Sequence, residues 1–466
     1  MIRAIHERAV ALVAVSQIRD FTRGNIPKQL VVFAWPLFLS NLLQVVYNMV
    51  DMVVVGRVLG KVGISAVSIG GDVTNLLTFV AMGFASAGQV LIARYIGAKQ
   101  REKLGTFVGT MCGFLMTCGV LLSTLALLFQ DQILRLMNTP EQAWEGAVSY
   151  SSICMMGLLF IYGYNIVSAI MRGMGDSRHP FIFISFAAVL NLVLDIIFVA
   201  MLDMGPGGAA LATVISQGTS FLFCAAFMVL HRDQFELDTR LSNFVRWNHE
   251  MLSELVKLGT PMAIKFASIQ VSKLFVNSWI NSYGVAVSAF AGIANKISSI
   301  SNLISNAMNT AGSTMAGQNI AAGEYDRVKQ IMNTLAVITL SISTLLSVVF
   351  ILFPTEIFAL FTDAGDADVL AIAGGYIPIA VMLFYGSALR CIMNALINGS
   401  GNYKINFATA ILDGIVMRIG LALLFGLVLD MKHYGFWLGD ALAGFTPFWI
   451  GLVFYYSGKW KNAKAT

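Results

Sequence analysis

The chain has 466 residues, of which 57% are hydrophobic and only 12% are charged. Soluble domains carry about 25% charged residues, so this composition excludes an ordinary soluble protein and is typical of a membrane protein with many spanning helices. The net charge of +5 comes from the loops and not from a basic stripe with interleaved aromatic residues, so we expect no nucleic-acid partner.

Twelve apolar segments are each long enough to cross a hydrocarbon core of about 30 Å. In chain order they are residues 30–56, 62–92, 104–130, 148–171, 181–202, 207–230, 258–281, 285–316, 330–353, 371–396, 406–429 and 435–457. The predicted fold is therefore an all-α, multi-pass membrane protein. Five cysteines fall within these segments without metal-ligand spacing, so we expect packing residues and no metal centre or cofactor.

Lys and Arg residues are distributed unequally over the loops. The two tails and the even-numbered loops contain 21 of them, whereas the odd-numbered loops contain four. Because positively charged residues stay in the cytoplasm, both termini are predicted to be cytoplasmic. The expected location is the inner (cytoplasmic) membrane of the cell.

The second half of the chain repeats the first. At an offset of 226 residues, "RGMGDSRHPF" lies on "NGSGNYKINF", and at an offset of 224, "FQDQILRLM" lies on "FPTEIFALF". The repeat predicts two pseudo-symmetric six-helix lobes, as in transporters built from parallel halves. The predicted parts are an N-terminal tail (1–27), an N-lobe (28–230), a cytoplasmic linker (231–257), a C-lobe (258–457) and a C-terminal tail (458–466).

The first segment carries a polar stripe. Asn41, Gln44, Asn48 and Asp51 follow one another at steps of three, four and three, which places them on one face of a helix. An Asp at the centre of a membrane helix costs roughly 2.5–3.5 kcal/mol on insertion scales. Such a residue therefore requires a functional explanation.

A second aspartate is predicted at the same depth. Asp195, in "NLVLDIIFV", lies in the outer half of the fifth segment, with Asn191 one turn away on the same face. Thr213, on the returning sixth segment, reaches a similar depth. Together with Asp51, these side chains form one predicted group of oxygen ligands.

Two carboxylates held close in a low dielectric cannot both stay ionised and unpaired, so one takes a proton or a cation neutralises them. Carboxylate, amide and hydroxyl oxygens suit a hard cation. The sequence therefore predicts a Na⁺ or H⁺ site. In the alternative, Asp51 pairs with Arg57 and Asp195 makes an ordinary polar contact.

Other polar residues also recur at helical spacing. Asp72, Asn75 and Thr78 step along the second segment, and Asn302, Asn306 and Asn309 step along the eighth. Such residues often only join neighbouring helices. Together with Asn41, Gln44 and Asn48 they are the candidate lining of a substrate cavity.

The second half is chemically different, because its segments carry basic residues. Lys265, Lys273, Lys296, Arg390 and Arg418 lie in or near the segments, together with Asp413 and Asp440. Asp413 and Arg418 are five residues apart, on diverging faces of an α-helix, so we expect their partners on other helices. A structural ion-pair network and a site for an anionic substrate group both remain open.

The chain resembles the multidrug and toxic compound extrusion (MATE) transporters, in particular the DinF-like prokaryotic branch. The resemblance is carried by "PLFLSNLLQVVYNMVDMVVVGR", "ARYIGAKQ", "RGMGDSRHP", "NLVLDIIF", "STMAGQNIAAGE" and "NGSGN". It implies a V-shaped pair of six-helix lobes that exports drugs or metabolites against Na⁺ or H⁺ re-entry.

The resemblance also implies roles for particular residues. In that branch an Asp of the first segment, an Asn and Asp of the fifth and a Thr of the sixth form the cation site, and Asp51, Asn191, Asp195 and Thr213 match in type and spacing. Polar groups of the fourth segment approach this site, so Asn165 and Ser168 are candidate neighbours.

The predicted function is a cation-coupled antiporter for amphiphilic, often cationic, small molecules, working as a monomer among membrane lipids. The alternatives are a lipid-linked saccharide flippase of the same architecture and a non-transporting receptor or scaffold. An enzyme is not expected, because the sequence contains no Ser-His-Asp order, metal cluster or phosphate-binding loop.

Overall fold

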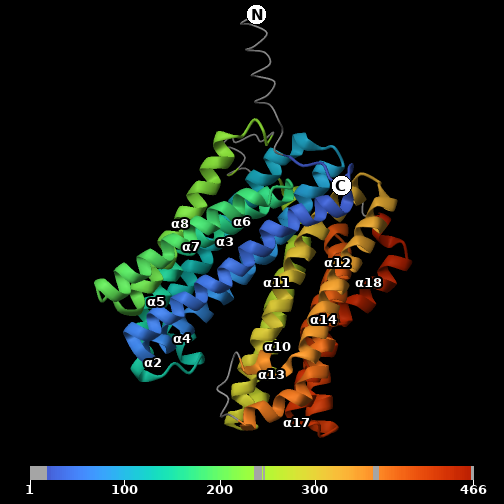
Figure 1. The fold of residues 1–466 in the computed structure, drawn as a ribbon. Coiled ribbons are helices and arrows are strands. Elements are labelled where there is room, and N and C mark those ends of the chain that lie inside the picture. Colours follow the sequence, from blue (N-terminus) through green and yellow to red (C-terminus); the bar gives the residue numbers. More distant parts are fainter. Residues whose placement is uncertain (1–17, 236–243, 245–246, 360–366, 463–466) are drawn as a thin grey trace, which may run out of the picture. The chain divides into compact units, whose positions relative to one another are not determined.

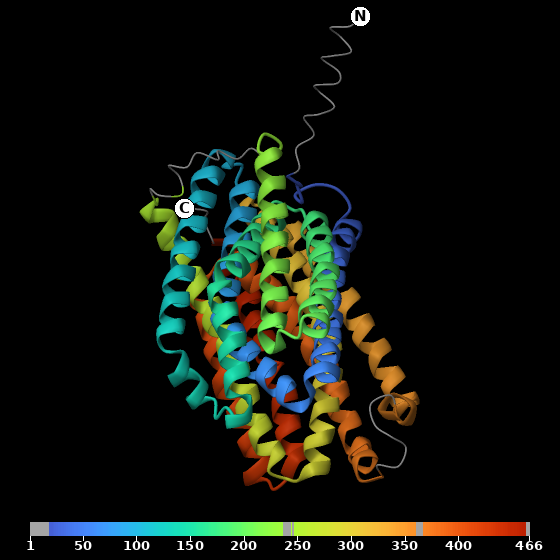
Figure 2. The same cartoon turned by 90° about the vertical axis from the view of Figure 1, so that its left-hand side faces the viewer.

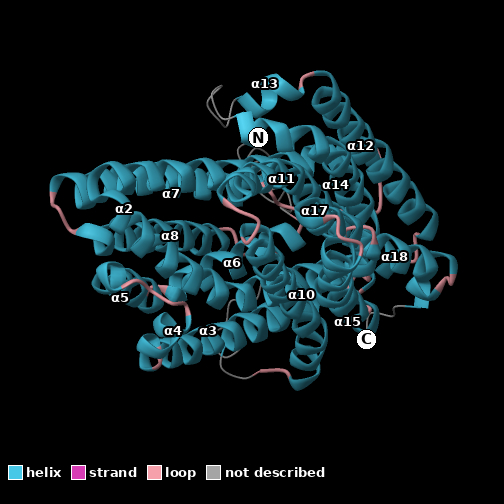
Figure 3. Ribbon diagram, turned by 90° about the horizontal axis from the view of Figure 1, so that it is seen from below, coloured by secondary structure: helices cyan, strands magenta, loops and turns pink. Residues whose placement is uncertain are grey.

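The computed structural model describes residues 18–235, 244, 247–359 and 367–462. The first 17 residues of the predicted N-terminal tail, part of the central linker and the last four residues of the C-terminal tail lie outside the described residues. Within the described ranges every regular element is a helix, as Figure 3 shows. The predicted all-α class is confirmed.

The chain forms two compact units. The first unit contains Leu39–Gly259 together with the described residues up to Asp20, and the second contains Phe21–Phe38 and the residues from Thr260 onward. The helix that begins the chain's membrane region thus has its first turns in the second unit and continues into the first.

The first unit consists mainly of long apolar helices. They are the greater part of α2 (Ile26–Gly97), α3 (Leu104–Leu128), α4 (Gln130–Leu136), α5 (Glu141–Met156), α6 (Leu158–Gly173), α7 (Arg178–Asp195) and α8 (Gly205–Leu230), with the 3₁₀ turn η1 (Arg101–Lys103) and the π-helical segment η2 (Ile196–Met201). Figure 2 shows this unit from the side, with α7 and α8 in green. These two helices pack against each other, and α8 also packs against α5 and α6.

Two glycines divide segments of the first unit. Gly60 has φ +63, a left-handed conformation that interrupts α2 between the first and second predicted segments. Gly157 separates α5 from α6, which are bent by 48° within the predicted fourth segment. A Cβ on Gly157 would lie 2.3 Å from Val214 Cγ2, so the close approach of α8 requires glycine at the bend.

Besides Phe21–Phe38, the second unit contains the part of α10 (His249–Asn281) from Thr260 onward. The start of α10 belongs to the first unit. The second unit continues with α11 (Val285–Ala321), α12 (Tyr325–Leu352), α13 (Pro354–Ala359), α14 (Ala367–Ser400), α15 (Tyr403–Ile411), η3 (Leu412–Met417), α16 (Arg418–Leu423), η4 (Leu424–Val428), α17 (Lys432–Ala443), α18 (Thr446–Tyr456) and η5 (Lys459–Asn462). Of these, η3 and η4 are π-helical. Figure 1 shows α12, α14 and α18 side by side, and α14 contacts both of the others.

The start of α2 is held in the second unit by apolar and polar contacts. Leu30 and Phe33 are fully buried in a core that includes Met315 of α11 and Leu335 of α12. The backbone N–H of Phe21 donates to Gln318 Oε1 at 2.8 Å. Burial of large apolar side chains at roughly 1.5–3 kcal/mol each explains why residues 21–38 pack with this unit.

The predicted internal repeat is visible in the backbone. Gly175 and Gly401, at the offset of 226, both have positive φ values, as do Lys99 and Gly323 at the offset of 224. Left-handed residues are uncommon outside turns, so their recurrence at the offsets found in the sequence is independent support for two related halves.

Eight described helices are long and apolar enough to cross a membrane, and the bent pair α5 and α6 makes nine. In that count α2 is one helix although Gly60 divides it into two segments. The remaining two predicted segments are α10 and α11, which are long but carry more polar side chains.

Candidate functional site

The two aspartates predicted to meet do meet. Asp51 lies on α2, ahead of the Gly60 kink, and Asp195 is the last residue of α7, where the α-helix passes into the π-helical segment η2. Their carboxyl groups lie within hydrogen-bonding reach of each other. Asp195 is fully buried, and Asp51 is partly buried.

No donor satisfies this pair. Asp51 Oδ1 and both carboxyl oxygens of Asp195 are buried without an N–H or O–H partner in the described part of the chain. Arg57 is exposed and forms no ion pair with Asp51 among the described residues, so the alternative pairing expected from the sequence is not present. A shared proton or a bound cation is the remaining way to stabilise two buried carboxyl groups this close.

A small cavity of about 10 Å³ lies in the first unit; its lining includes residues one turn before Asp51 and Asp195, but neither aspartate itself. Its polar lining includes the other two predicted ligands, Asn191 of α7 and Thr213 of α8, with Tyr47 and Gln217. The Nδ2 atom of Asn191 is buried without a partner in the described residues, whereas the Thr213 hydroxyl donates to the Ala209 carbonyl at 3.0 Å. The cavity has about the volume that one water-sized group needs.

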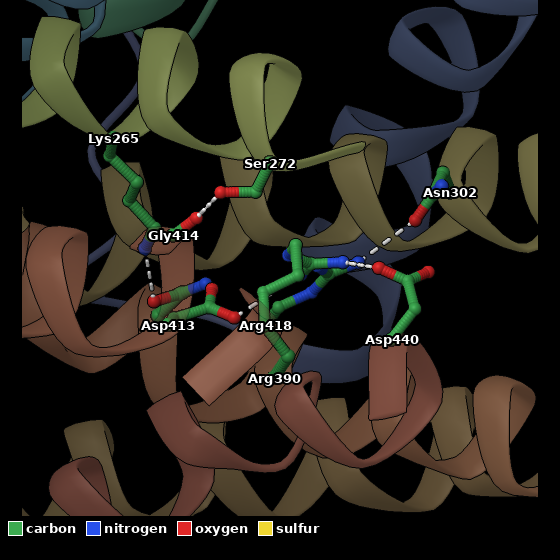
Figure 4. Close-up of polar contacts among 9 residues, drawn as sticks. Lys265, Ser272, Asn302, Arg390, Asp413, Gly414, Arg418 and Asp440 are labelled. Carbon is green, nitrogen blue, oxygen red and sulfur yellow. Dashed lines mark hydrogen bonds and ion pairs between the residues drawn. The ribbon is translucent and has the colours of Figure 1, made fainter. Parts of the chain in front are cut away.

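The second unit contains a buried ion-pair network, shown in Figure 4. Arg418, only 2% exposed, lies between Asp413 and Asp440. Its Nη2 atom donates to Asp413 Oδ1 at 3.3 Å, and its Nη1 atom donates to Asp440 Oδ1. This arginine therefore bonds to carboxylates from two separate helical elements and offsets one of their two negative charges.

The pairing of Asp413 with Arg418 corrects the sequence prediction that their faces diverge too far. These residues lie in and directly after η3, which is a π-helix. Its hydrogen bonds join residues five apart, so residues i and i+5 share a face. The expectation of a partner on another helix is met by Asp440 of α17.

Two further basic groups bond to neutral amides. Lys265 Nζ donates to Asn394 Oδ1 at 2.6 Å, and Arg390 Nη2 donates to Asn302 Oδ1 at 2.9 Å. Figure 4 shows Arg390 and Asn302 next to the Arg418 group. One predicted cavity residue, Asn302, is thus part of this network.

A family model described as MatE matches residues 36–197 and 261–424, one match in each half of the chain. The chain belongs to the MATE family. The two matched ranges also agree with the duplication seen in the sequence and in the backbone.

Two relatives extend over almost the whole of this MATE chain. The "Probable multidrug resistance protein YpnP" of Bacillus subtilis is 28% identical over 96% of this chain and 98% of its own length. The "Probable multidrug resistance protein NorM" of Thermotoga maritima is 23% identical over 94% of each chain.

Solved structures show the same fold. A structure described as the outward-facing conformation of a multidrug resistance MATE family transporter has a TM-score of 0.87, with 23% identity over 96% of this chain and 98% of that one. A transporter from Pyrococcus furiosus, described as having a binding pocket of reversed polarity, has a TM-score of 0.83, with 24% identity over 94% of this chain and 96% of that one. The likeness confirms the twelve-helix MATE fold predicted from the sequence.

The two candidate neighbours of the MATE carboxylate pair stay a prediction, because the contacts found for them are with other groups. The Asn165 side chain donates to the Ile161 carbonyl of its own helix at 2.8 Å. Ser168 is buried beside Tyr164 and Cys224. Neither is among the residues that line the small cavity of the first unit.

The candidate substrate-cavity residues differ in how far they are exposed. Asn48, Asp72, Asn75 and Asn306 have exposed side chains, and Asn41 and Gln44 are partly buried. Their role as a substrate lining stays a prediction.

Sequence reasoning missed Tyr47 and Gln217. The Tyr47 side chain lies within reach of Gln217, and it also lies near both carboxylates. Helical spacing could have identified both residues, because Tyr47 precedes Asp51 by one turn and Gln217 follows Thr213 by one turn.

Proposed function

We propose that this MATE protein is a secondary active antiporter that exports amphiphilic drugs or metabolites, often cationic, in exchange for Na⁺ or H⁺. The re-entering ion binds at Asp51, Asn191, Asp195 and Thr213. The proposal rests on one observation: the partly buried carboxyl group of Asp51 and the fully buried one of Asp195 interact without a donor or basic partner in the described residues.

The ion acts by changing the charge of the pair. A proton or Na⁺ removes much of the repulsion between the carboxylates, so α2 and α7 pack more closely when the site is occupied. A cationic substrate is attracted by the ionised pair and repelled once the ion is bound. The substrate and the ion therefore compete for the negatively charged pair, and this competition leads to their exchange.

The kink and the bend in the first unit provide places for movement. Gly60 ends the helical segment that carries Asp51, and Gly157 divides the α5–α6 pair that packs on α8. Small rotations at these residues would change the distance between Asp51 and Asp195 without unfolding either helix. We place the protein as a monomer in the inner membrane, with both termini in the cytoplasm and no covalent reaction.

The test is efflux of the fluorescent cation ethidium from vesicles that contain the purified full chain. Na⁺ and pH gradients are imposed separately, so the coupling ion is identified in the same experiment. Asp51→Asn and Asp195→Asn should each lower gradient-driven efflux by more than about 100-fold, because the loss of an essential charge removes coupling itself.

The matched control is Asp203→Asn. Asp203 is exposed and has φ +50, a conformation that Asn adopts well, so the folding of this variant should be normal. Its efflux should equal that of the wild-type chain. Full coupled efflux by folded Asp51→Asn or Asp195→Asn protein would overturn the proposal.

A lipid-linked saccharide flippase is the second candidate, and the basic groups of the second unit favour it. A flippase of this kind would move a lipid-linked phosphate across the vesicle membrane. The same vesicles discriminate between the two functions, since lipid translocation that is insensitive to both ion gradients and to Asp195→Asn would favour the flippase.

A further inference from the structure

The basic residues of the second unit exceed its acidic residues. Six charged side chains in this unit interact electrostatically with one another. Four are basic and two are acidic: Lys265, Lys273, Arg390 and Arg418 against Asp413 and Asp440. This group, called the cationic cluster below, has a formal charge of +2.

The two carboxylates of the cationic cluster are already engaged. Both bond to Arg418, through the contacts described above. Within the described residues, Lys265 and Arg390 make hydrogen bonds only to amide oxygens, which carry no net charge. With Lys273, three basic groups of the cluster thus have no bonded carboxylate among the described residues.

Lys273 is the least satisfied member. It lies on α10 and forms no hydrogen bond or ion pair with any described residue. Of the two carboxylates in the cluster, Asp440 has the larger electrostatic effect on it. Lys273 is partly buried, and a charged residue without a bonded partner in a membrane-spanning region usually marks a ligand or ion path. The side chain is therefore available to an anion from outside the fold.

A cavity of about 20 Å³ opens at Lys273. Its polar lining includes the amides Asn277 and Asn295 and the hydroxyl of Ser298, and its apolar lining includes the rings of Tyr376 and Trp437. The volume suffices for one small polar group. A few polar groups within an aromatic lining are typical of small-molecule sites.

We propose that Lys273 binds an oxyanion, a carboxylate or phosphate, that is attached to an apolar body. Asn277, Asn295 and Ser298 supply neutral N–H and O–H donors, and the two rings contact the apolar part. Asp440 also lines the cavity and bonds to Arg418, which it shares with Asp413, and the cationic cluster as a whole keeps its charge of +2. The site lies wholly within the second unit and does not depend on ion coupling in the first.

The oxyanion has two possible sources, a free amphiphile and a lipid head group, and one binding experiment separates them. Radiolabelled octanoate is equilibrated with the purified full chain in a non-ionic detergent, and protein-free micelles supply the background. Unlabelled octyl phosphate, octylammonium and phosphatidylglycerol then compete. Displacement by octyl phosphate but not by octylammonium is the expected result.

Phosphatidylglycerol decides the source. If it displaces octanoate at lower concentration than octyl phosphate does, the site takes a lipid head group. If it displaces octanoate only at higher concentration, the site takes a free amphiphile. Either order supports an oxyanion site.

The variants test the assignment to Lys273. Lys273→Gln should weaken octanoate binding by about 10-fold or more, the loss of one charge-assisted hydrogen bond, whereas Lys273→Arg should stay within about three-fold of wild type. Lys404→Gln, the same change at an exposed lysine of this unit, should have no effect. The proposal is overturned if the wild-type protein does not prefer octanoate over octylammonium, a result that requires no variant. It is also overturned if folded Lys273→Gln protein binds octanoate with wild-type affinity.

Discussion

The two units of this transporter handle charge inside the membrane in opposite ways. In the first, Asp51 and Asp195 lie together with no donor or basic partner in the described residues. In the second, Arg418 bonds to both Asp413 and Asp440, and the surrounding cluster has an excess of basic groups. The two halves of the duplicated chain thus differ. The site in the first half lacks a positive charge, and the site in the second half lacks a negative charge.

This difference predicts that the loss of a charge affects the stability of the two units differently. A buried ion pair contributes little net stability, but the loss of one partner costs about 3–5 kcal/mol because it leaves an uncompensated charge. An unpaired carboxylate pair works the other way, since the removal of one charge relieves repulsion. The same Asp→Asn change should therefore have opposite effects on folding in the two units.

The largest expected effect is that of Arg418→Gln. This change leaves two acidic groups without their arginine, and we expect the free energy of unfolding to fall by about 3–5 kcal/mol. Thermal unfolding of the purified chain in detergent measures the loss. Arg57→Gln, at an exposed arginine, is the control and should leave the transition unchanged. Equal stability of the two variants would show that the network is not structural.

A backbone change should break the same network less severely. A Cβ on Gly414 would lie 2.7 Å from Ser268 Cβ, so Gly414→Ala forces η3 away from α10 and costs about 1–3 kcal/mol. Ser272 would also lose its hydrogen bond to the Gly414 carbonyl. Gly420→Ala is the matched control, because no atom lies within 4 Å of its Cβ position. Equal unfolding temperatures for the two variants would contradict the close approach.

In the first unit, Asp195→Asn should stabilise the protein. The change removes one of two adjacent negative charges, and at an intermediate dielectric the gain is about 1–2 kcal/mol in the absence of Na⁺. Asp413→Asn is the contrasting variant in the second unit and should destabilise. If both substitutions lower the unfolding temperature alike, the two carboxylate sites do not differ as described.

The smallest effect is expected for Asn191→Ala. Asn191 supplies one neutral ligand beside the pair, so its loss should weaken the apparent affinity for the coupling ion by about five-fold, near 1 kcal/mol. The concentration of Na⁺ or H⁺ that gives half-maximal efflux measures this change. Asn165→Ala should leave that concentration unchanged, because the Asn165 side chain bonds to its own helix.

The fold and the carboxylate pair could be predicted because both depend on regular helices. Apolar length gives the membrane segments, and counting residues from the loops places Asp51 and Asp195 at one depth. Departures from the regular helix could not be predicted. The π-helix η3 brings Asp413 and Arg418 onto one face, and Gly157 at the bend lies close against Val214, which is distant in the sequence.

Ser168 illustrates the other limit. The sequence places it on the fourth segment, but the rotation of α6 about its axis determines which neighbours the side chain meets. Those neighbours are Tyr164 and Cys224. Helix rotation is set by packing with neighbouring helices, which a single sequence does not specify.

One comparison of unfolding temperatures tests the central claim, that the carboxylate pair of the first unit is stable only with a bound cation. Wild-type chain and the double variant Asp51→Asn, Asp195→Asn are unfolded across a range of Na⁺ concentrations and pH values. A cation that binds only the folded wild type stabilises it in proportion to the logarithm of its concentration. The wild type should therefore begin less stable than the variant and gain on it as Na⁺ or H⁺ is raised. A difference between the two that stays constant at every Na⁺ concentration and pH would contradict the account.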